Sequence, residues 1–457
     1  MASPLQVLFL GTGTSTGLPL APCLTASNPY PFSGHVPILP PSSSSSAPPP
    51  KASYDPDGPW PSNIACACCR SAVHPDVPEG WKNKRGNTSV VLRKKASPRG
   101  EWKNVVVDVG KTFREQAVRM FPKWGVNTID AVILTHGHAD AYFGLDDLRE
   151  WCQRQRKAID VYLNQDTYDK VAETFPYMVD LTKASGGGDV PKLIFKVIGN
   201  EDDFQVAGID VKVLPVHHGI YFHTVPAPTS GSSSSEPAEK LEPEPLICLG
   251  FKFDDSVVYI SDVSSIPDRT WERMLESDKP KSRKSVLPTP DDTPPRSDSP
   301  TNPLNGLSDL SVSQPPSLPI LIIDALWPLR SHASHFGFGQ ALEAALRLKP
   351  TYTYLTDSSH PTSHFMWEEL CLSLHDQHGQ RKDHPDGPQS EWVVKQAWDK
   401  VLGSKKDGER GMGERWKEFG GVVRPAWDGL VLEVNGDASE DNKDVERLEQ
   451  STRGVVY

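Results

Sequence analysis

The segment AVILTHGHADA, residues 131–141, limits what this chain can fold into more than any other stretch of the sequence. Its first half is apolar and β-forming and predicts a buried strand, but that strand leads directly into His136, His138 and Asp140. Leaving three such groups unpaired in an interior would cost on the order of several kcal/mol. Two imidazoles and a carboxylate at this spacing can meet at one point, so the segment predicts a metal-binding strand end.

Two later apolar runs end in side chains of the same kind. The run LPVHHG contains His217 and His218, and the run YISD ends at Asp262. Loops at strand ends gather functional groups in folded proteins, so we expect these residues to lie near the first histidine pair. Because successive residues of a strand face opposite ways, only one of the two adjacent histidines is expected to be a ligand.

The rest of the chain alternates between short β-rich runs and segments with helical spacing. Strands are expected in VLFLGTG, TSVVLR, NVVVDVG, IDVYLN, FQVAGIDVKVLPV, LICLGFKF, SVVYISD, LPILIIDAL, TYTYLTD and RPAWDGLVLEV. Helices are expected in KTFREQAVRMF, LDDLREWCQRQ, DTYDKVAETF and FGQALEAALRL. This alternation predicts an α/β fold in which helices cover the sheets.

Four segments rich in proline, serine or charge interrupt this pattern. They bury too little apolar surface to offset their ordering entropy, so we expect disordered insertions at about 27–62, 225–245, 276–319 and 376–390. Residues 435–457 are expected to be a disordered tail for the same reason. The remainder is then one domain over residues 1–434.

Charge and hydropathy exclude several classes of protein. A formal net charge of −11 argues against a phosphate-backbone binder, which gains affinity from clustered Lys and Arg, so nucleic acid is not an expected partner. The N-terminal apolar stretch is too short for a signal peptide, and no run of about 20 apolar residues occurs. We therefore expect a soluble, cytoplasmic protein with no membrane partner, and a homodimer is compatible with the sequence.

The motifs, taken in order, resemble the metallo-β-lactamase superfamily. The residues that carry the resemblance are FLGTGTSTGLP, THGHADA, VHHG, YISD and SHFGFGQALEAALRLKP. Within the superfamily they are most similar to the phosphodiesterase branch typified by phosphoribosyl cyclic phosphate phosphodiesterase. The resemblance implies an αββα metallo-β-lactamase sandwich with metal ions at one edge, here with long disordered insertions.

The resemblance also implies roles for individual residues. His136, His138 and His218 match ligands of the first metal ion, and Asp262 matches the carboxylate that bridges two ions. Asp108 matches a buried aspartate that orients a ligand histidine, the alternative being a strand-end cap.

Two positions depart from the family pattern, and both affect the second ion. Ala141 stands where the family has a histidine after Asp140, and Asp357 stands where it has a histidine after a strand. Asp140, Asp262 and Asp357 would form an almost all-oxygen site, which favours Mn²⁺ or Mg²⁺ over a tight Zn²⁺ site. Alternatively the second site is empty and the centre is mononuclear, and the sequence leaves both readings open.

The CACC motif points to a separate metal site. Seven cysteines, three of them in this motif, suit metal thiolates better than a disulfide framework. The resemblance implies a structural zinc bound by Cys66, Cys69, His360 and either Cys23 or Cys68. The alternative is a group of small buried cysteines without a metal.

Three further residues match positions near the family's pocket. His335, just before a predicted helix, resembles the proposed general acid, because imidazole can protonate a leaving alkoxide near neutral pH. Arg85 and Arg149 resemble phosphate-binding positions, and each is equally compatible with a surface salt bridge.

These expectations favour a metal-dependent hydrolase. The leading interpretation is a phosphodiesterase that acts on a small cyclic or nucleotide-like phosphate ester by metal-bound hydroxide, with Asp140 and Asp262 holding the nucleophile. The cofactors would be Zn²⁺ at the structural site and Zn²⁺ or Mn²⁺ at the catalytic site. The alternatives are an endonuclease of the tRNA 3′-processing type, which would need a basic, Gly-rich arm, and a non-catalytic metal-binding scaffold.

Overall fold

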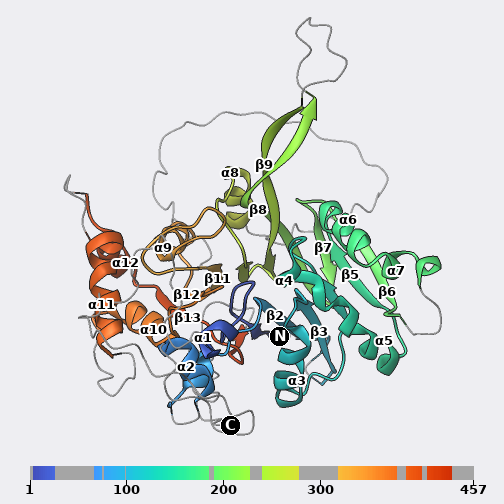
Figure 1. The fold of residues 1–457 in the computed structure, drawn as a ribbon, viewed down its shortest axis with the longest axis horizontal. Coiled ribbons are helices and arrows are strands. Elements are labelled where there is room, and N and C mark those ends of the chain that lie inside the picture. Colours follow the sequence, from blue (N-terminus) through green and yellow to red (C-terminus); the bar gives the residue numbers. More distant parts are fainter. Residues whose placement is uncertain are drawn as a thin grey trace, which may run out of the picture.

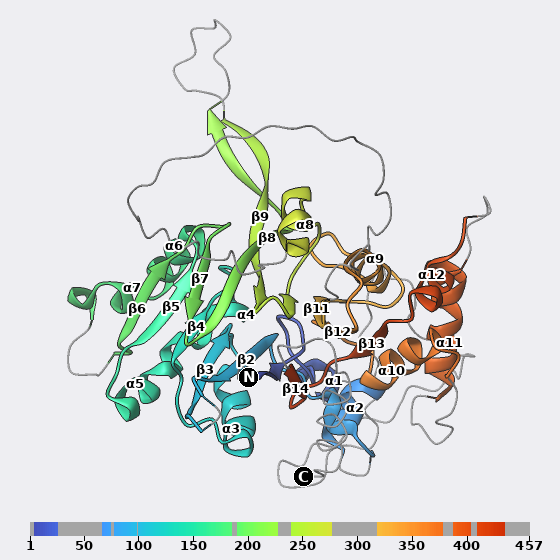
Figure 2. The ribbon, with the colours of Figure 1, turned by 180° about the vertical axis from the view of Figure 1, so that it is seen from behind.

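The computed structural model describes residues 4–25, 66–74, 77–97, 99–184, 190–226, 239–276, 318–377, 387–403 and 409–434. Two seven-stranded mixed sheets face each other, and helices cover the outer side of each (Figures 1 and 2). The expected αββα sandwich is thereby confirmed. None of the helices found in the described ranges has the length and apolarity needed to cross a bilayer.

Each sheet contains both parallel and antiparallel neighbours. The first sheet has the order β14 (Val431–Val434), β1 (Leu5–Gly11), β2 (Ser89–Lys95), β3 (Trp102–Val107), β4 (Ala131–Ile133), β5 (Ile159–Leu163) and β6 (Leu193–Val197). The second has the order β13 (Val422–Pro425), β12 (Tyr352–Thr356), β11 (Ile320–Asp324), β10 (Val257–Ile260), β9 (Glu239–Phe253), β8 (Ile209–Pro226) and β7 (Asp203–Val206).

The helices divide between the two outer layers, apart from two short helices near the cysteine motif. The first sheet carries α3 (Phe113–Trp124), α4 (Ala139–Tyr142), α5 (Arg149–Gln155), α6 (Gln165–Thr174) and α7 (Pro176–Val179). The second carries α8 (Asp268–Leu275), α9 (Phe338–Leu348), α10 (His364–Ser373), α11 (Gly387–Ala397) and α12 (Met412–Phe419). The two short helices are α1 (Ala21–Thr25) and α2 (Ala67–Val73).

The near-continuous apolar character of the strands follows from this layering. Alternate residues of a strand face opposite ways, and here both faces are covered. In β1, Val7 and Phe9 lie in the core between the sheets, whereas Leu8 and Leu10 pack toward the helices. Residues on both faces of such a strand are therefore buried, and polar side chains lie at the strand ends.

The strand ends that carry polar residues converge at one edge of the sandwich. Strands β10, β11 and β12 are parallel neighbours, so their carboxyl ends lie side by side. The end of β4, in the other sheet, is joined to them because Leu249 N of β9 donates a 2.9 Å hydrogen bond to Thr135 O. Ser358 N, just after β12, donates to Thr12 O at 3.1 Å and makes a second link between the sheets.

Two expected segments differ in their boundaries. The run FQVAGIDVKVLPV forms β7 and β8 rather than one strand, because Ala207 and Gly208 turn the chain with φ angles of 51° and 81°. The insertion expected at 225–245 is strand at both described ends, since β8 reaches Pro226 and β9 begins at Glu239. Helix α11 similarly begins at Gly387, inside the insertion expected at 376–390.

The two other expected insertions, at 27–62 and 276–319, and the 435–457 tail lie almost wholly outside the described residues. The division of the chain into one domain with insertions therefore stays a prediction. Figures 1 and 2 show β8 and β9 continuing beyond the sandwich as a two-stranded arm. Ile220, Phe222 and Leu241 of this arm are exposed.

The loop after β4 is placed by close backbone contact with the loop after β3. Val109 N donates to Ala141 O at 2.8 Å, and Gly144 N donates to Val109 O at 2.7 Å. Gly110 lies against the same loop, and a Cβ atom built on it would overlap the carbonyl oxygen of Asp140. Only glycine therefore fits at this position.

We predict that Gly110→Ala lowers the free energy of unfolding by about 3 kcal/mol, because the added methyl group must displace backbone. Gly125→Ala is the matched control: Gly125 caps α3 at φ 64° with no heavy atom within 4 Å of its Cβ position, so only the left-handed backbone penalises alanine. That penalty is about 1 kcal/mol. Urea unfolding of both variants measures the difference, and equal losses would contradict the steric argument.

Candidate metal centre

Three histidines from distant parts of the chain meet at this edge of the sandwich. The ligand nitrogens of His136, His138 and His218 all lie within 4.8 Å of one another. Their ring centroids are 4.7 Å apart for His136 and His138, and 5.1 Å from either ring to His218. His136 is 1% exposed, and its Nε2 atom has no hydrogen-bond partner. A buried nitrogen with an unused lone pair is what a bound cation would satisfy.

Hydrogen bonds on the far side of two rings decide which nitrogen faces the centre. The Thr135 hydroxyl donates to Asp108 Oδ2 at 2.8 Å and lies 2.8 Å from His136 Nδ1, so it must accept the proton of that nitrogen. His218 Nδ1 lies 2.8 Å from the carbonyl oxygen of Ser334, to which it can only donate. In both rings Nε2 therefore keeps the lone pair that can bind a metal.

Asp108 orients the ligand histidine, as the resemblance implies, but it does so through Thr135. Its Oδ1 atom accepts from Thr135 N at 2.8 Å and its Oδ2 atom accepts from the Thr135 hydroxyl. The contact to the ligand histidine passes through that hydroxyl and is not direct. Burial raises the pKa of Asp108, and the two bonds from Thr135 partly oppose this shift.

Burial keeps the three imidazoles neutral. It lowers the pKa of His136 to about 3 and lowers the pKa values of His138 and His218 as well. For Asp262, burial disfavours the charged form, but the neighbouring imidazoles of His136, His218 and His335 outweigh it and lower its pKa. Neutral imidazoles and an ionised carboxylate are the protonation states that metal ligands require.

Asp262 completes the first group of donors, and Cys248 lies beside it. The ligand atoms of His136, Cys248 and Asp262 lie within 4.8 Å of one another, and so do those of His218, Asp262 and His335. Cys248 Sγ is 3.8 Å from His136 Nδ1, on the side of the ring away from Nε2, and burial raises its pKa. Sequence reasoning missed Cys248, which sits inside an apolar strand with no polar neighbour to mark it. His217 faces away and bonds Ser265 Oγ at 3.0 Å.

Asp140 lies at the rim of this group. Its Oδ1 atom is 4.0 Å from His136 Nε2, and its side chain is 16% exposed. Burial and the charge of Asp262 raise its pKa, and the charge of Lys111 partly opposes the shift. The next residue, Ala141, is 2% exposed and contributes only backbone contacts.

A second cluster of titratable groups surrounds His335. Its Nδ1 atom lies 3.0 Å from Asp324 Oδ2, 2.9 Å from Asp357 Oδ2 and 3.8 Å from Asp262 Oδ1. Burial disfavours the protonated ring, but the charges of Asp324 and Asp357 outweigh it and raise the pKa of His335 to about 12. Burial also raises the pKa values of both carboxyl groups, that of Asp324 to about 6.

Asp324 was not anticipated as a site residue, although the sequence contains the signal. It ends the apolar run ILIID, as Asp262 ends YISD. In the structure its Oδ2 atom accepts from Val263 N at 3.1 Å and from Phe336 N at 3.2 Å in addition to His335. Asp324 thus fixes the loop after β10 and the turn that carries His335.

The cysteine motif forms a second, separate group of donors. Cys23, Cys66, Cys69 and His360 are all buried, and their ligand atoms lie within 4.8 Å of one another. His360 Nε2 is 2.8 Å from Cys66 Sγ and 3.2 Å from Cys23 Sγ. Cys68 points elsewhere, toward Asn83 Oδ1 at 3.7 Å and Thr362 O at 3.8 Å. The structure therefore brings in Cys23, not Cys68, as the third thiol.

The electrostatics of this cluster fit a bound cation. Hydrogen bonds from Cys66 and Cys69 lower the pKa of Cys23, and the bond to Cys23 in turn raises the pKa of Cys66. Three buried thiols that compete for thiolate character around one imidazole match the closed Cys₃His donor set of structural metal sites. No open ligand position is left for a substrate.

Neither predicted phosphate-binding arginine reaches the histidine cluster. Arg85 is 2% exposed, and its guanidinium donates to Ser358 O, Asn83 Oδ1 and Thr362 O, each at 3.1 Å. It supports the loop that carries His360 and has no free face for a substrate.

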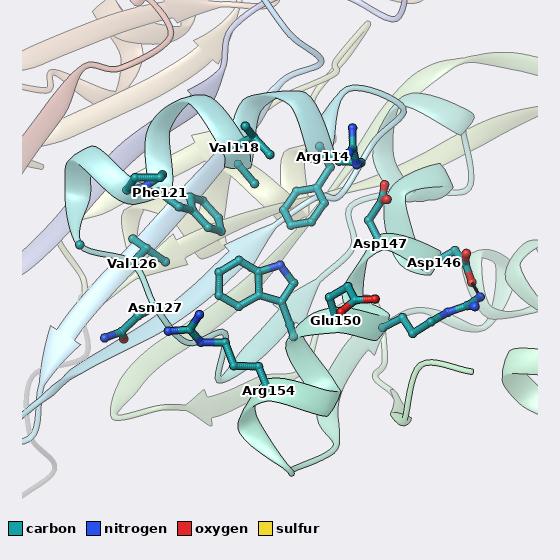
Figure 3. Close-up of a pocket in the computed structure, with 15 residues that line it drawn as sticks. Arg114, Val118, Phe121, Val126, Asn127, Asp146, Asp147, Glu150 and Arg154 are labelled. Carbon is teal, nitrogen blue, oxygen red and sulfur yellow. Dashed lines mark hydrogen bonds and ion pairs between the residues drawn. The ribbon is translucent and has the colours of Figure 1, made fainter. Parts of the chain in front are cut away.

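Arg149 belongs to a different part of the surface. Its Nη2 atom donates to Asp146 Oδ1 at 2.7 Å, and both residues line a cleft of about 820 Å³ between α3 and α5 (Figure 3). None of the clustered histidines, cysteines or the carboxylates around His335 lines this cleft. The structure thus places Arg85 in a buried structural contact and Arg149 in an ion pair beside the cleft, and the substrate-binding roles expected for them stay predictions.

Known proteins provide three kinds of similarity. A family model described as a beta-lactamase superfamily domain matches residues 103–279. An octanoyltransferase of Porphyromonas gingivalis (strain ATCC BAA-308 / W83) is 32% identical over 158 residues, which are 34% of this chain and 28% of that protein. The chain thus spans little more than a quarter of the curated relative that it matches.

Solved structures are similar over longer stretches at low identity. A diphosphatase from the PhnP family is 20% identical, with a TM-score of 0.48 over 95% of this chain and 98% of that one. The metallo-beta-lactamase fold protein YhfI from Bacillus subtilis is 13% identical, with a TM-score of 0.43 over 94% and 99%. The short form of human tRNase Z is 14% identical, with a TM-score of 0.36 over 78% and 94%.

The matched residues 103–279 contain the three clustered histidines and Asp262. Two facing sheets with these donors at their shared edge define a metal-binding protein of the αββα class. This part of the chain, residues 103–279, is similar to the beta-lactamase superfamily domain. The donor groups that it contains are of the kind that could hold a divalent metal ion.

We predict that Cys66→Ser and Cys23→Ser each remove one metal ion per chain and lower the midpoint of thermal unfolding, because a closed site with three of four ligands holds its ion weakly. Cys68→Ser is the matched control, since Cys68 is equally buried but lies outside the cluster. Metal content by plasma mass spectrometry and differential scanning calorimetry give the two readouts. If Cys68→Ser loses as much metal as Cys66→Ser, the assignment of the four ligands is wrong.

Proposed function

We propose that the protein is a metal-dependent phosphodiesterase that hydrolyses a small cyclic or nucleotide-like phosphate ester. The observation that carries the proposal is the convergence of neutral His136, His138 and His218 with ionised Asp262, next to a histidine held between carboxylates. The first group fits a cation, and the second fits a proton donor. Hydrolysis of a phosphodiester needs both.

The donor set also bears on the metal. His136, His138, His218 and Asp262 would hold the catalytic ion, and three imidazoles with one carboxylate suit Zn²⁺ or Mn²⁺. When bound, such a cation acts as a Lewis acid that lowers the pKa of water and withdraws electron density from the phosphoryl oxygens. The thiolates of Cys23, Cys66 and Cys69 with His360 suit a structural Zn²⁺.

Two carboxylates of the chain, Asp140 and Asp262, activate and orient the attacking water. Asp140 lies at the rim of the cluster with a raised pKa, which suits a group that takes a proton from water. Asp262 stays ionised and orients the same water through its second oxygen. Water adds to phosphorus, and the proton that it loses passes to Asp140.

His335 protonates the leaving group. Asp324 and Asp357 hold its Nδ1–H, so the ring keeps a fixed orientation and Nε2 is the atom available for proton transfer. The same carboxylates raise its pKa, and the ring is therefore protonated at neutral pH. As the phosphorus–oxygen bond breaks, His335 gives its proton to the leaving alkoxide, and the products are a phosphomonoester and an alcohol group.

A nuclease of the tRNA 3′-processing type fits the structure less well. The arm formed by β8 and β9 is the segment that would reach a large substrate, but its described part is apolar and acidic: Ile220, Phe222 and Leu241 are exposed, and Tyr221 bonds Glu244 at 2.7 Å. Phosphate backbones are bound by clustered lysine and arginine, which this arm does not present along its described strands. We therefore favour a small substrate.

We predict that His218→Ala lowers the turnover of bis-p-nitrophenyl phosphate at least about 100-fold, because losing a ligand of the cation removes several kcal/mol of transition-state stabilisation. His217→Ala is the matched control: it changes the adjacent residue, which faces away and contacts Ser265. Its turnover should stay within about twofold of the wild type. Absence of hydrolysis by the metal-loaded wild-type protein would instead favour the non-catalytic scaffold.

Asp140→Ala separates proton transfer from metal binding. Asp140 stands at the rim of the histidine cluster, so we predict that turnover of the same ester falls on the order of 100-fold while metal content and the unfolding midpoint stay unchanged. Asp146→Ala, which removes a carboxylate from the surface cleft beside Arg149, serves as the control and should keep full turnover. Loss of a metal ion in Asp140→Ala would contradict this assignment.

A further inference from the structure

We propose that the catalytic centre of this chain binds one metal ion, and that His335 and Asp357 fill the place of the second. The inference rests on the proposed function only in calling the centre catalytic. The resemblance on which the ligands were assigned implies two ions, the second one held by Asp140, the residue after it, the bridging Asp262 and the residue after β12. The structure departs from that arrangement at three points.

The first point is the residue after Asp140. Ala141 offers no ligand atom on its side chain and is 2% exposed. Both backbone polar groups of Ala141 already form hydrogen bonds that hold the loop. Its N–H donates to His138 O at 2.9 Å, and its carbonyl accepts from Val109 N at 2.8 Å. One protein ligand of a second ion is therefore lost, and no backbone group of Ala141 replaces it.

The second point is the isolation of Asp140. Candidate metal ligands within 4.8 Å of one another form five groups in the described ranges of the chain, and Asp140 belongs to none of them. Its Oδ1 atom lies 4.0 Å from His136 Nε2, an atom already directed at the first ion. On this side of the centre, a second ion would thus have the carboxylate of Asp140 as its single ligand.

The third point is the contents of the space between the remaining carboxylates. His335 Nδ1 lies 2.9 Å from Asp357 Oδ2, 3.0 Å from Asp324 Oδ2 and 3.8 Å from Asp262 Oδ1. The Nδ1–H group of His335 donates to Asp324 Oδ2 and lies beside Asp357 Oδ2, which has no hydrogen-bond partner of its own, so the imidazole takes up the space between these carboxylates. The other oxygen of Asp357 accepts from the Thr88 hydroxyl at 3.2 Å, so this side chain is held away from the histidine cluster.

The two substitutions therefore act together. A histidine after Asp140 and a histidine after β12 would both direct a nitrogen at one ion, whereas Ala141 and Asp357 remove the first and turn the second position toward His335. Loss of either ligand alone would leave a weakened site. Among the described residues, loss of both leaves Asp140 outside every group of candidate ligands, whereas Asp324, His335 and Asp357 form a group of their own.

Counting metal ions tests the inference. The wild-type chain, loaded with Zn²⁺ or Mn²⁺ and desalted, should contain two ions per chain by plasma mass spectrometry, one at the cysteines and one at the histidines. Cys66→Ser should contain one. Asp357→Asn, which keeps the size of the side chain, should still contain two. Three ions in the wild type, or the loss of one ion in Asp357→Asn, would overturn the proposal; the latter would place an ion at Asp324, His335 and Asp357 instead.

A double variant tests the cause. Ala141→His combined with Asp357→His restores both nitrogen ligands, and we expect it to gain a third ion per chain. In Mn²⁺-loaded Cys66→Ser protein, electron paramagnetic resonance should then change from a single-ion spectrum to that of a coupled pair. A double variant that is folded by circular dichroism yet holds only two ions would overturn the assignment of the loss to these two residues.

The same preparations keep the two proposals apart. Hydrolysis of bis-p-nitrophenyl phosphate by a wild-type chain that holds three ions would refute the one-ion centre and leave the proposed function intact. A wild-type chain with two ions and no hydrolysis would refute the proposed function and leave the one-ion centre intact.

Discussion

The site depends on one residue at the end of β4, because Thr135 is both the joint between the two sheets and the support of the first histidine. Its carbonyl accepts from Leu249 N of the opposite sheet at 2.9 Å, and its hydroxyl links Asp108 to His136 Nδ1. Without the first bond the two sets of donors would not lie at one edge. Without the second, His136 Nε2 would not be fixed as the lone pair that faces the centre.

The two groups of candidate metal ligands are connected by the short loop after β12. Asp357 and His360 are three residues apart after β12, and the first belongs to the His335 cluster while the second belongs to the cysteines. Arg85 donates hydrogen bonds to two carbonyl oxygens of the same loop, Ser358 O and Thr362 O. The cysteine site therefore anchors the far end of the loop that positions Asp357 against His335.

Buried charge is the second constraint on this edge. Asp108, Asp262, Asp324 and Asp357 are all buried, and an uncompensated carboxylate in such a place is costly. Three of them have clear partners: Thr135 for Asp108, the neighbouring imidazoles for Asp262, and His335 with backbone amides for Asp324. Asp357 lies 2.9 Å from His335 Nδ1, but its Oδ2 atom has no hydrogen-bond partner. His335 thus lies among carboxylates that would otherwise face a second cation, and this links the geometry of the centre to its proposed content of one ion.

Local features of the fold and the site could be predicted from the sequence, whereas features that depend on long-range contacts could not. Apolar runs that end in His136, Asp262 or the cysteine motif are local signals, and strand alternation is equally local, so the sequence by itself determined the sheets covered by helices and most of the candidate ligands, and the family resemblance implied the sandwich. Cys248 and Asp324 were missed, and the contacts of Arg85 and Arg149 could not be predicted, because they depend on what lies opposite these residues. Only the tertiary structure decided that Cys23 rather than Cys68 joins His360, and that Asp357 turns to His335. Cys23 and His360 are 337 residues apart and His335 and Asp357 lie on different loops, so their distances and hydrogen bonds exist only once the chain has folded.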